Sequence, residues 1–166
     1  MTPDVNVLVA AFRVDHSHHV PARTWLSRAL EACATGGTLE ILPMVAAAFV
    51  RLVTDARVFR IPDSARDAHA FLRNLLAADG ASMPHLGSEW NTFERLCIDL
   101  GVVGEDVPDA WIAAVVTADG LHLVTFDRDF TRLLRPTQYT LLSRTLGIAE
   151  SRPKYGARKE IGRAHV

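Results

Sequence analysis

The sequence predicts an α/β fold, a three-layer sandwich in which helices cover both faces of a mainly parallel central sheet. Two observations support this prediction. Short apolar segments alternate along the chain with longer segments of helical periodicity. The short segments are apolar on both sides, which is typical of strands buried between two layers of helices. Because such sheets bind ligands at the carboxyl ends of their strands, residues that follow a strand are the candidate functional residues.

The elements of the N-terminal half follow from apolar runs and their stop signals. Residues 4–12 (DVNVLVAAF) are a short Val-rich run and are predicted to form a buried strand. A helix follows, with Pro21 in its first turn and the glycine pair 36–37 as its end. Residues 38–43 (TLEILP) are expected to form a brief strand. Residues 44–59 are apolar nearly all round and predict a largely buried helix.

The C-terminal half is predicted to contain three further helices, each bounded by cap-type residues or a proline at its start and by a glycine at its end: residues 64–79, 89–100 and 107–119. Ser88 is the expected cap of the second of these helices, and Pro108 marks the start of the third. Three apolar strands are expected around them, at residues 82–86, 121–126 and 138–142. A short helix or turn is expected directly after the strand 121–126.

Composition limits the classes of function. The 166 residues fit one domain, and a formal net charge of −1 gives no overall attraction to nucleic acid. Any binding of a polyanion must therefore come from a local patch or a metal ion. No apolar run approaches the roughly 20 residues of a membrane span, and no basic region precedes the first apolar segment. We therefore expect a cytoplasmic protein in which Cys33 and Cys97 are free thiols.

The end of the chain differs from the rest. Residues 147–166 are basic and lack apolar periodicity, so we expect a disordered tail after a domain formed by residues 1–146. The last six residues, 161–166 (IGRAHV), match what a common sequencing adapter would encode in frame. We therefore hypothesise that this segment is an assembly artefact, and its charges are not counted as a sign of RNA binding.

Carboxylates occupy positions that a parallel α/β fold can bring together. Asp4 opens the first predicted strand, Asp109 lies in the first turn of a helix, and Asp127 and Asp129 follow the strand 121–126. Clustered carboxylates repel each other unless a cation neutralises them, and Mg²⁺ and Mn²⁺ prefer such oxygen ligands. A metal held in this way activates water and stabilises the charge that develops during phosphodiester hydrolysis. The sequence thus indicates a metal-dependent phosphodiesterase.

Each acid also has a plainer interpretation. Asp4 could be a turn residue at the end of a strand, and Asp109 a residue that merely favours a helix start. Asp127 and Asp129 could cap the short helix that follows them. The combination is a stronger signal than any single residue. Other acids, including Asp106, are assigned to the surface or to helix caps.

The segments DVNVL and VPDAWIAAVVTADGLHLVTFDRDF resemble those of PIN-domain proteins. More narrowly, they resemble the VapC-type toxins of bacterial toxin–antitoxin pairs, in the subgroup abundant in mycobacteria and other actinobacteria. The resemblance spans residues 3 to about 142. It implies a Mg²⁺- or Mn²⁺-dependent endoribonuclease that hydrolyses RNA. It also implies a small VapB-type antitoxin as partner and a homodimer.

Site residues carry over from the family motifs by position. The resemblance makes Asp4, Asp109 and Asp127 the expected catalytic metal ligands, and Asp129 the acid that accompanies them. Asn6 and Thr125 match positions that brace the carboxylates by hydrogen bonds. Thr125 could also be a plain β-branched strand residue.

One position departs from the family pattern. The wider family often has a Glu in the helix after the second strand, where this chain has Ala48 ahead of Arg51. Its absence puts a complete two-metal site in doubt. Glu40 could compensate or could be an ordinary surface residue.

Other polar and aromatic residues have weaker functional signals. Arg51 and Arg128 are candidate RNA contacts, although each could pair with a nearby acid. The histidines of residues 16–19 (HSHH) lack zinc-ligand spacing and are expected in a loop or helix start at the rim of the site. The three tryptophans are expected in core or dimer packing: Trp25, Trp90 and Trp111.

Two other classes of function compete with the nuclease. A PIN-like module that lacks the helix Glu could hold RNA or a partner and cleave poorly. A phosphoryl-accepting receiver-type domain also clusters acids, but it requires a Lys after a late strand, where this chain has Arg128. We rank the receiver-type domain last.

Overall fold

A computed structural model describes residues 1–143 of the chain. Its strands are short and all pair in parallel. One sheet has the order β1-β4-β5, formed by Thr2–Pro3, Leu123–Thr125 and Tyr139–Leu141. The other pairs β2 (Leu39–Glu40) with β3 (Ala81–Ser82). A backbone hydrogen bond of 2.8 Å from the Glu40 N–H to the Met1 carbonyl joins the two sheets.

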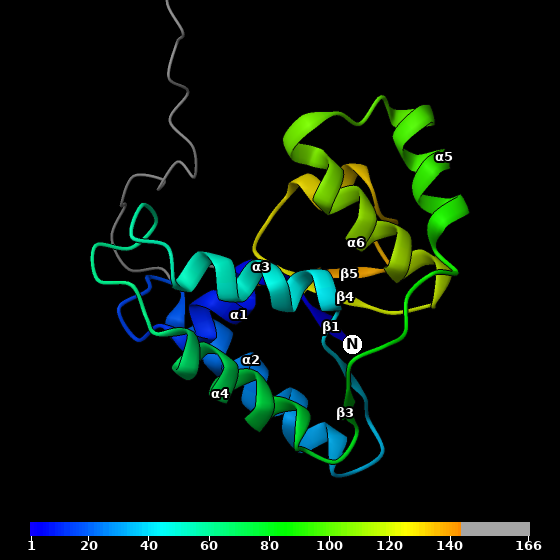
Figure 1. The fold of residues 1–166 in the computed structure, drawn as a ribbon. Coiled ribbons are helices and arrows are strands. Elements are labelled where there is room, and N and C mark those ends of the chain that lie inside the picture. Colours follow the sequence, from blue (N-terminus) through cyan, green and yellow to red (C-terminus); the bar gives the residue numbers. More distant parts are fainter. Residues whose placement is uncertain (144–166) are drawn as a thin grey trace, which may run out of the picture.

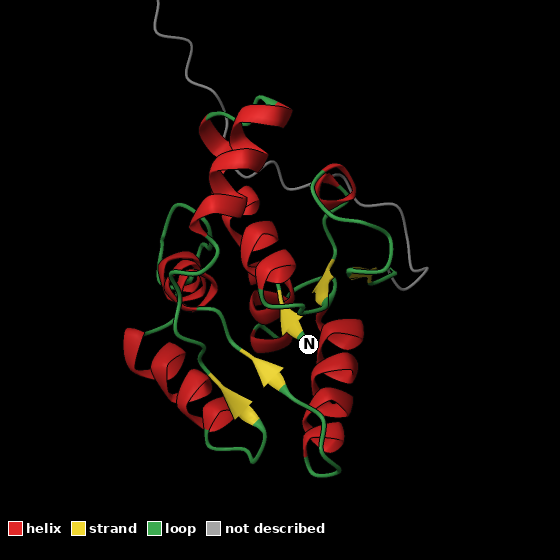
Figure 2. Ribbon diagram, turned by 90° about the vertical axis from the view of Figure 1, so that its right-hand side faces the viewer, coloured by secondary structure: helices red, strands yellow, loops and turns green. Residues whose placement is uncertain are grey.

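Helices lie on both sides of these strands, as Figure 2 shows. α1 (Val5–Phe12) packs against α2 (His19–Cys33) and α3 (Pro43–Val53), and α3 packs against α4 (Ala65–Leu76). α5 (Trp90–Leu100) packs on α6 (Val107–Ala118), and Figure 1 shows this pair apart from the α1–α4 group. The predicted three-layer α/β sandwich around a parallel sheet is confirmed.

The longest buried runs of the hydrophobic core lie in two apolar helices, α1 and α6. Residues 7–11 of α1 are all buried, as are residues 112–116 of α6. Aromatic rings join α1 to its neighbours, since Phe12 contacts Phe49 of α3 and Phe71 of α4 with ring centroids 5.4 and 5.2 Å apart. This packing fixes the position of α1, whose N-cap residue is the first candidate acid, Asp4.

The N-terminal run was assigned to the wrong element. Residues 4–12 were expected to form a buried strand, but the strand is Thr2–Pro3 and residues 5–12 form α1. A short run that is apolar on every side fits a buried helix as well as a buried strand, so periodicity alone could not decide. Asp4 therefore lies at the carboxyl end of β1 instead of opening a strand.

Two helix boundaries also differ from the prediction. Ser88 does not cap α5, because its hydroxyl donates to the Asp119 carboxylate at 3.2 Å and Glu89 occupies the cap position. α3 ends at Val53 instead of residue 59. Its last turn closes when the Thr54 hydroxyl donates to the Val50 carbonyl at 2.7 Å, and the chain then leaves in a loop.

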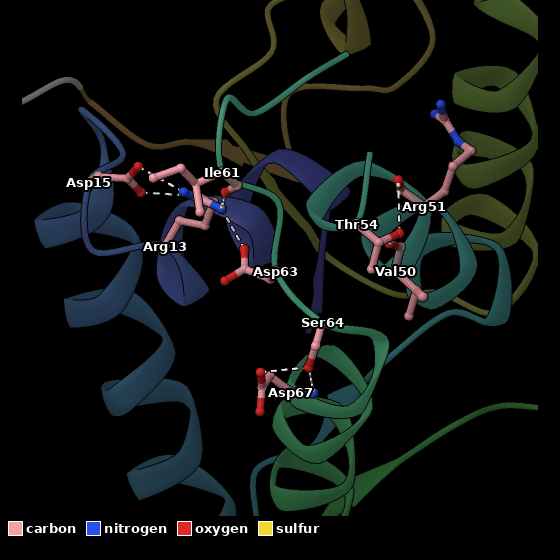
Figure 3. A network of polar contacts seen from close by, with 9 residues as sticks. All are labelled: Arg13, Asp15, Val50, Arg51, Thr54, Ile61, Asp63, Ser64 and Asp67. Carbon is pink, nitrogen blue, oxygen red and sulfur yellow. Dashed lines mark hydrogen bonds and ion pairs between the residues drawn. The ribbon is translucent and has the colours of Figure 1, made fainter. Parts of the chain in front are cut away.

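That loop, residues 54–64, is held against the end of α1 by Arg13. Figure 3 shows the Arg13 guanidinium between the carboxylates of Asp15 and Asp63 and the carbonyl of Ile61. The guanidinium also lies 4.1 Å from the centroid of the Phe59 ring. Both ends of α1 are thus anchored, one by this cluster and the other by Asp4.

The remaining elements agree with the prediction to within a few residues: α2, α4, α5 and α6, together with β2, β3, β4 and β5. The predicted short helix after β4 is a 3₁₀ helix, η2 (Asp129–Arg132). Cys33 and Cys97 are free thiols as expected. None of the helices within residues 1–143 is long and apolar enough to cross a membrane. The predicted tail, 147–166, and the suspected artefact, 161–166, lie outside the described residues.

Candidate active site

The ends of β1 and β4 bring the first two polar residues of the site together. The strands pair in parallel with Pro3 opposite Val124, and the Asp4 N–H donates to the Val124 carbonyl at 2.9 Å. Asp4 and Thr125 are therefore the next residues on neighbouring strands, and both are buried. Asp4 and Thr125 therefore lie at the carboxyl ends of β1 and β4, the edge at which a parallel α/β sheet binds ligands.

Asp4 is held by hydrogen bonds to both of its oxygens. It is the N-cap of α1, and its Oδ1 accepts from the Val5 N–H at 2.6 Å. Its Oδ2 accepts from the Asn6 side-chain amide and from the Thr125 hydroxyl, each at 2.6 Å. These donors orient a carboxylate that is only 2% exposed.

The same bracing residues position the turn that follows β4. Thr125 Oγ1 accepts from the Asp127 N–H at 2.9 Å, and Asn6 Oδ1 accepts from the Phe126 N–H at 3.2 Å. Asp127 Oδ1 in turn accepts from the Asp129 N–H at 2.8 Å. One connected network thus runs from Asp4 through Asn6 and Thr125 to Asp127 and Asp129. The predicted bracing contacts are present, whereas the catalytic roles stay predictions.

Asp109 reaches the site from a different element. It lies in the first turn of α6, where the helix dipole favours a negative charge. Within the described part of the chain, no hydrogen bond to its carboxylate is found, in contrast to Asp4. Its electrostatic neighbours are the acids Asp4, Asp127, Asp106 and Asp129. The four predicted acids therefore share one region.

Burial and mutual repulsion favour the protonated form of two of these acids. Burial raises the pKa of Asp4 to about 6, although the hydrogen bonds from Thr125, Val5 and Asn6 oppose that shift. Burial and then the charges of Asp4 and Asp127 raise the pKa of Asp109 to about 7. No cation is among the main causes of either pKa shift, and the basic side chain beside these acids, Arg132, pairs with Asp106 at 3.9 Å.

The chemistry of these donors fits a hard divalent cation. All four are carboxylates, the ligand type that Mg²⁺ and Mn²⁺ prefer. In residues 1–143, however, no three His, Cys, Asp or Glu side chains converge as a ready-made metal site. A Mg²⁺ ion commonly keeps several waters and uses one or two carboxylates, so two converging acids suffice for it. The prediction of four metal ligands stays untested by the geometry.

A small cleft lies beside Asp109. It is lined by two residues predicted as ligands and by four that were not: Asp109 and Asp129, and Val102, Asp106, Arg132 and Leu133. Asp106 was predicted to be a surface or cap residue, and it is the N-cap residue of α6 with an exposed side chain that also lines this cleft. Its spacing of three residues from Asp109 at the start of one helix was a usable signal, because residues at i and i+3 share a helix face.

The histidine segment lies at the edge of this site. The His18 ring stacks on Phe126, with centroids 4.7 Å apart and planes 21° apart, and Phe126 directly precedes Asp127. His16 contacts His18 in turn, and His19 Nδ1 lies 2.9 Å from the Ala10 carbonyl oxygen. The segment is a loop and a helix start, as expected, and it supports the turn that carries the acids.

The two predicted RNA-contact arginines occupy different surroundings. Arg128 is exposed between Asp127 and Asp129. Arg51 lines a groove between α3 and α4, and Figure 3 shows its side chain extending away from the Arg13 cluster. Neither arginine lines the cleft beside Asp109.

The position of the missing Glu is Ala48, half-buried within α3. Glu40 accepts a hydrogen bond from the Ser82 hydroxyl at 2.9 Å across the β2–β3 pair. It is not among the main charges that shift the pKa of Asp4 or Asp109. Nothing in this geometry indicates that Glu40 replaces the missing acid.

Comparison with known proteins identifies the family. The profile of the PIN domain matches residues 1–135. This chain belongs to the PIN-domain family. The predicted resemblance is thereby confirmed at the level of the family, and the acids at the ends of β1 and β4 lie in the matched region.

Characterised relatives of this PIN-domain chain come from Mycobacterium tuberculosis. It is 35% identical over 134 residues to the ribonuclease VapC25, an alignment that covers 78% of this chain and 89% of the relative. It is 34% identical over 130 residues to the ribonuclease VapC31, with 78% and 89% covered. It is 36% identical over 133 residues to the ribonuclease VapC43, with 80% and 88% covered.

A solved structure has the same fold. The PIN-domain chain superposes on VapBC2 from Rickettsia felis, solved bound to a DNA fragment from its promoter, with a TM-score of 0.61 and 18% identity. The match covers 86% of this chain and 98% of that chain. At this identity the likeness concerns the fold alone.

Proposed function

We propose that this chain is a metal-dependent endoribonuclease, the toxin component of a type II toxin–antitoxin pair. One observation carries the proposal: Asp4, Asp109, Asp127 and Asp129 share one electrostatic cluster at the carboxyl ends of β1 and β4. This arrangement supports phosphodiester hydrolysis, and the ribonuclease names of the mycobacterial relatives support RNA as substrate. The toxin would act on RNA in the cytoplasm.

In this proposal the four acids hold Mg²⁺ or Mn²⁺. The metal would activate a water molecule and stabilise charge on the phosphodiester. The Thr125 hydroxyl and the Asn6 amide keep the Asp4 carboxylate in one orientation. Asp127 is tied to the same network, because its N–H donates to Thr125 Oγ1 at 2.9 Å. The bound cation would favour the ionised form of Asp109, whose pKa burial and the neighbouring acids raise to about 7.

The direct test is cleavage of RNA by the full-length protein with Mg²⁺ or Mn²⁺. Asp4→Ala and Asp109→Ala variants should lose cleavage. Persistent cleavage in both variants would refute the assignment of the site. No cleavage by the wild type, with RNA still bound by all three proteins, would favour the second candidate function.

That second candidate is a PIN-like module that binds RNA or a partner and cleaves poorly. Ala48 is the observation in its favour, since a helix acid is missing from α3. An Ala48→Glu variant separates the two functions, because it should raise cleavage by a module that merely lacks this acid. It should change an already active nuclease little.

We also propose a small VapB-type antitoxin as partner. The groove between α3 and α4 has a volume of ≈ 530 Å³ and suits an apolar segment flanked by acidic residues. Most of its lining side chains are apolar, and Arg51, His69 and Arg73 also line it. Replacing Ala47 in this groove with Trp should prevent co-purification with a co-expressed VapB-type antitoxin, whereas Arg66→Ala, outside the groove, should not.

A homodimer is proposed on the outer face of α5 and α6. No residue of α5 is buried, and five large apolar side chains of α5, α6 and the segment between them are exposed: Trp90, Ile98, Leu100, Val103 and Trp111. Exposed large apolar side chains that gather in one part of a protein surface are typical of interaction sites. An Ile98→Glu variant should run as a monomer in sedimentation experiments where the wild type runs as a dimer.

A further inference from the structure

The cleft beside Asp109 contains one basic side chain. Arg132 lines it together with Asp109, Asp129 and Asp106, and Val102 and Leu133 complete its walls. Its volume is ≈ 10 Å³, on the order of one water molecule or one small ion. A phosphodiester cannot enter so small a space, so a substrate would lie across its mouth. There it would meet the side chains at the rim.

Arg132 is held loosely. It is the last residue of η2, and its side chain is 60% exposed. Its Nη1 lies 3.9 Å from the Asp106 Oδ2, and the Asp106 side chain is itself 53% exposed. Exposed ion pairs at such a distance contribute little to stability, because water screens both charges. Arg132 can therefore leave Asp106 for a stronger partner at small cost.

The acids of this site repel the phosphates of an RNA strand. Asp4, Asp106, Asp109, Asp127 and Asp129 all repel phosphate, and the chain as a whole is not basic. A cation bound by the acids answers part of this repulsion, but it does not hold the strand on either side of the reacting bond. Of the residues that line the cleft, Arg132 has the charge to do so. A guanidinium also matches two phosphate oxygens with parallel hydrogen bonds.

We propose that Arg132 is a substrate-contact residue that exchanges Asp106 for an RNA phosphate. In the free protein Arg132 faces Asp106, and with RNA bound it holds a backbone phosphate beside Asp109 and Asp129. The inference rests on the proposed ribonuclease function and adds a residue that the family motifs did not indicate. It assigns to Arg132 the role that the sequence suggested for Arg51 and Arg128.

A purely structural role for the ion pair makes a different prediction. If the pair only fastened η2 to the start of α6, removing either partner would have the same effect. If Arg132 exchanges partners, the two removals have opposite effects on RNA binding. Arg132→Ala loses the phosphate contact, whereas Asp106→Asn frees Arg132 and removes one repelling charge.

The experiment measures affinity for a fluorescently labelled, mixed-sequence single-stranded RNA in Mg²⁺. All proteins carry Asp127→Asn so that the RNA stays intact. Arg132→Ala should weaken binding about tenfold, in line with the loss of a charged hydrogen bond. It should also reduce the slope of log affinity against log salt by about 0.7 to 1. Asp106→Asn should bind at least as tightly as its parent.

Arg135→Ala is the matched control. Arg135 is exposed, carries the same charge three residues further on and does not line the cleft. Its removal should change affinity less than twofold. Arg132→Lys should retain part of the affinity, and thermal unfolding should show that every variant is folded. Equal affinities for the Arg132→Ala and Arg135→Ala proteins, or a weakened Asp106→Asn protein, would overturn the inference.

Cleavage by the proteins without Asp127→Asn separates the two proposals. If the wild type cleaves RNA and Arg132→Ala raises KM about tenfold with a smaller change in kcat, both proposals hold. If the wild type cleaves while Arg132→Ala is indistinguishable from it, only the inference on Arg132 fails. If the wild type does not cleave with either metal but the opposite affinity shifts appear, the ribonuclease proposal fails and the Arg132 contact stands. If no RNA binds at all, both fail.

Discussion

The two principal acids, Asp4 and Asp109, both lie at the start of a helix, but they differ in burial, in hydrogen bonding and in pKa. At the start of α1, Asp4 is almost fully buried, yet three donors hold it and its pKa is raised only to about 6. In the first turn of α6, Asp109 is less buried, but acids surround it and its pKa is raised to about 7. The more exposed carboxylate thus has the larger shift.

Burial is the largest cause of both shifts, but at Asp4 three hydrogen-bond donors oppose it, whereas at Asp109 the neighbouring acids add to it. Asp4 belongs to the framework of the fold, because its oxygens link α1 to β4. Asp109 has acids as its neighbours, and its negative charge depends on a cation from solution. Changes at Asp4 should therefore affect folding and function together, and changes at Asp109 function alone.

The largest expected effect is on cleavage. Asp4→Asn and Asp109→Asn should each reduce single-turnover RNA cleavage at least about 100-fold, because a metal contributes several kcal/mol of charge stabilisation. Urea unfolding should separate them. Asp4→Asn should lose about 1–2 kcal/mol of unfolding free energy, since donors around residue 4 lose an acceptor, whereas Asp109→Asn should lose none. Equal destabilisation of both variants would contradict the comparison.

The next effect is on the stability of the metal-free protein. Both acids have an ordinary pKa of 3.8, which the folded protein raises to about 6 for Asp4 and about 7 for Asp109. Between the ordinary and the raised pKa, the folded state therefore binds more protons than the unfolded state. The unfolding free energy should therefore fall as pH rises from about 4 to 7. Thermal unfolding in EDTA at pH 5 and pH 8 measures this fall.

Asp109→Asn is the control for that pH dependence. It removes the group with the higher pKa, so its melting temperature should fall less than that of the wild type between pH 5 and pH 8. Added Mg²⁺ should raise the melting temperature of the wild type at pH 8 and affect Asp109→Asn less. A wild-type protein that becomes more stable toward pH 8 in EDTA would contradict the prediction that the ionised acids of this cluster destabilise the fold.

A smaller effect should follow from removing one donor to Asp4. Thr125→Val keeps the shape of the side chain but loses the hydroxyl that donates to Asp4 and accepts from Asp127. Cleavage should fall roughly 10-fold, as for other residues that orient metal ligands. In the wild type the hydrogen bond from Thr125 lowers the pKa of Asp4, so its loss should raise that pKa. The acidic limb of the pH–rate profile should therefore move to higher pH. Thr125→Ser should restore both properties.

The smallest effect should come from the ring stack beside the acids. His18→Ala removes the ring that packs on Phe126 and should reduce cleavage only a few-fold, since such stacking contributes about 0.5–1.5 kcal/mol. His18→Phe should retain the stack and the activity. If His18→Phe were as impaired as His18→Ala, His18 would act through its nitrogens and not through its ring.

The layer architecture and the acids at the strand ends were predictable because they depend on local signals. Glycines 101 and 120 end helices, Pro108 starts one, and Asp127 and Asp129 directly follow a strand. The motif around Asp109 added the third element of the site. These features require only that strands and helices alternate, which the apolar pattern specifies.

The remaining features depend on tertiary contacts. The run after Asp4 is apolar on all sides, and only its packing against α2 and α3 distinguishes helix from strand. Arg51 belongs to the α3–α4 groove, whereas Arg132 lines the acidic cleft, and no local pattern separates the two arginines. Which charge neighbours which acid is decided by how α6 and η2 pack.

The anchoring of α1 at both ends has a consequence for genetics. Its residues 7–11 are fully enclosed, Asp4 is fixed at its front, and Arg13 is clamped at its rear. Cells that survive expression of the proposed toxin should therefore carry two separable classes of escape mutation. Substitutions within α1 should eliminate the protein itself through misfolding and proteolysis. Substitutions at Asp109 or Asp127 should abolish toxicity while the protein level stays normal. An immunoblot of the survivors would therefore distinguish substitutions that prevent folding from those that remove activity.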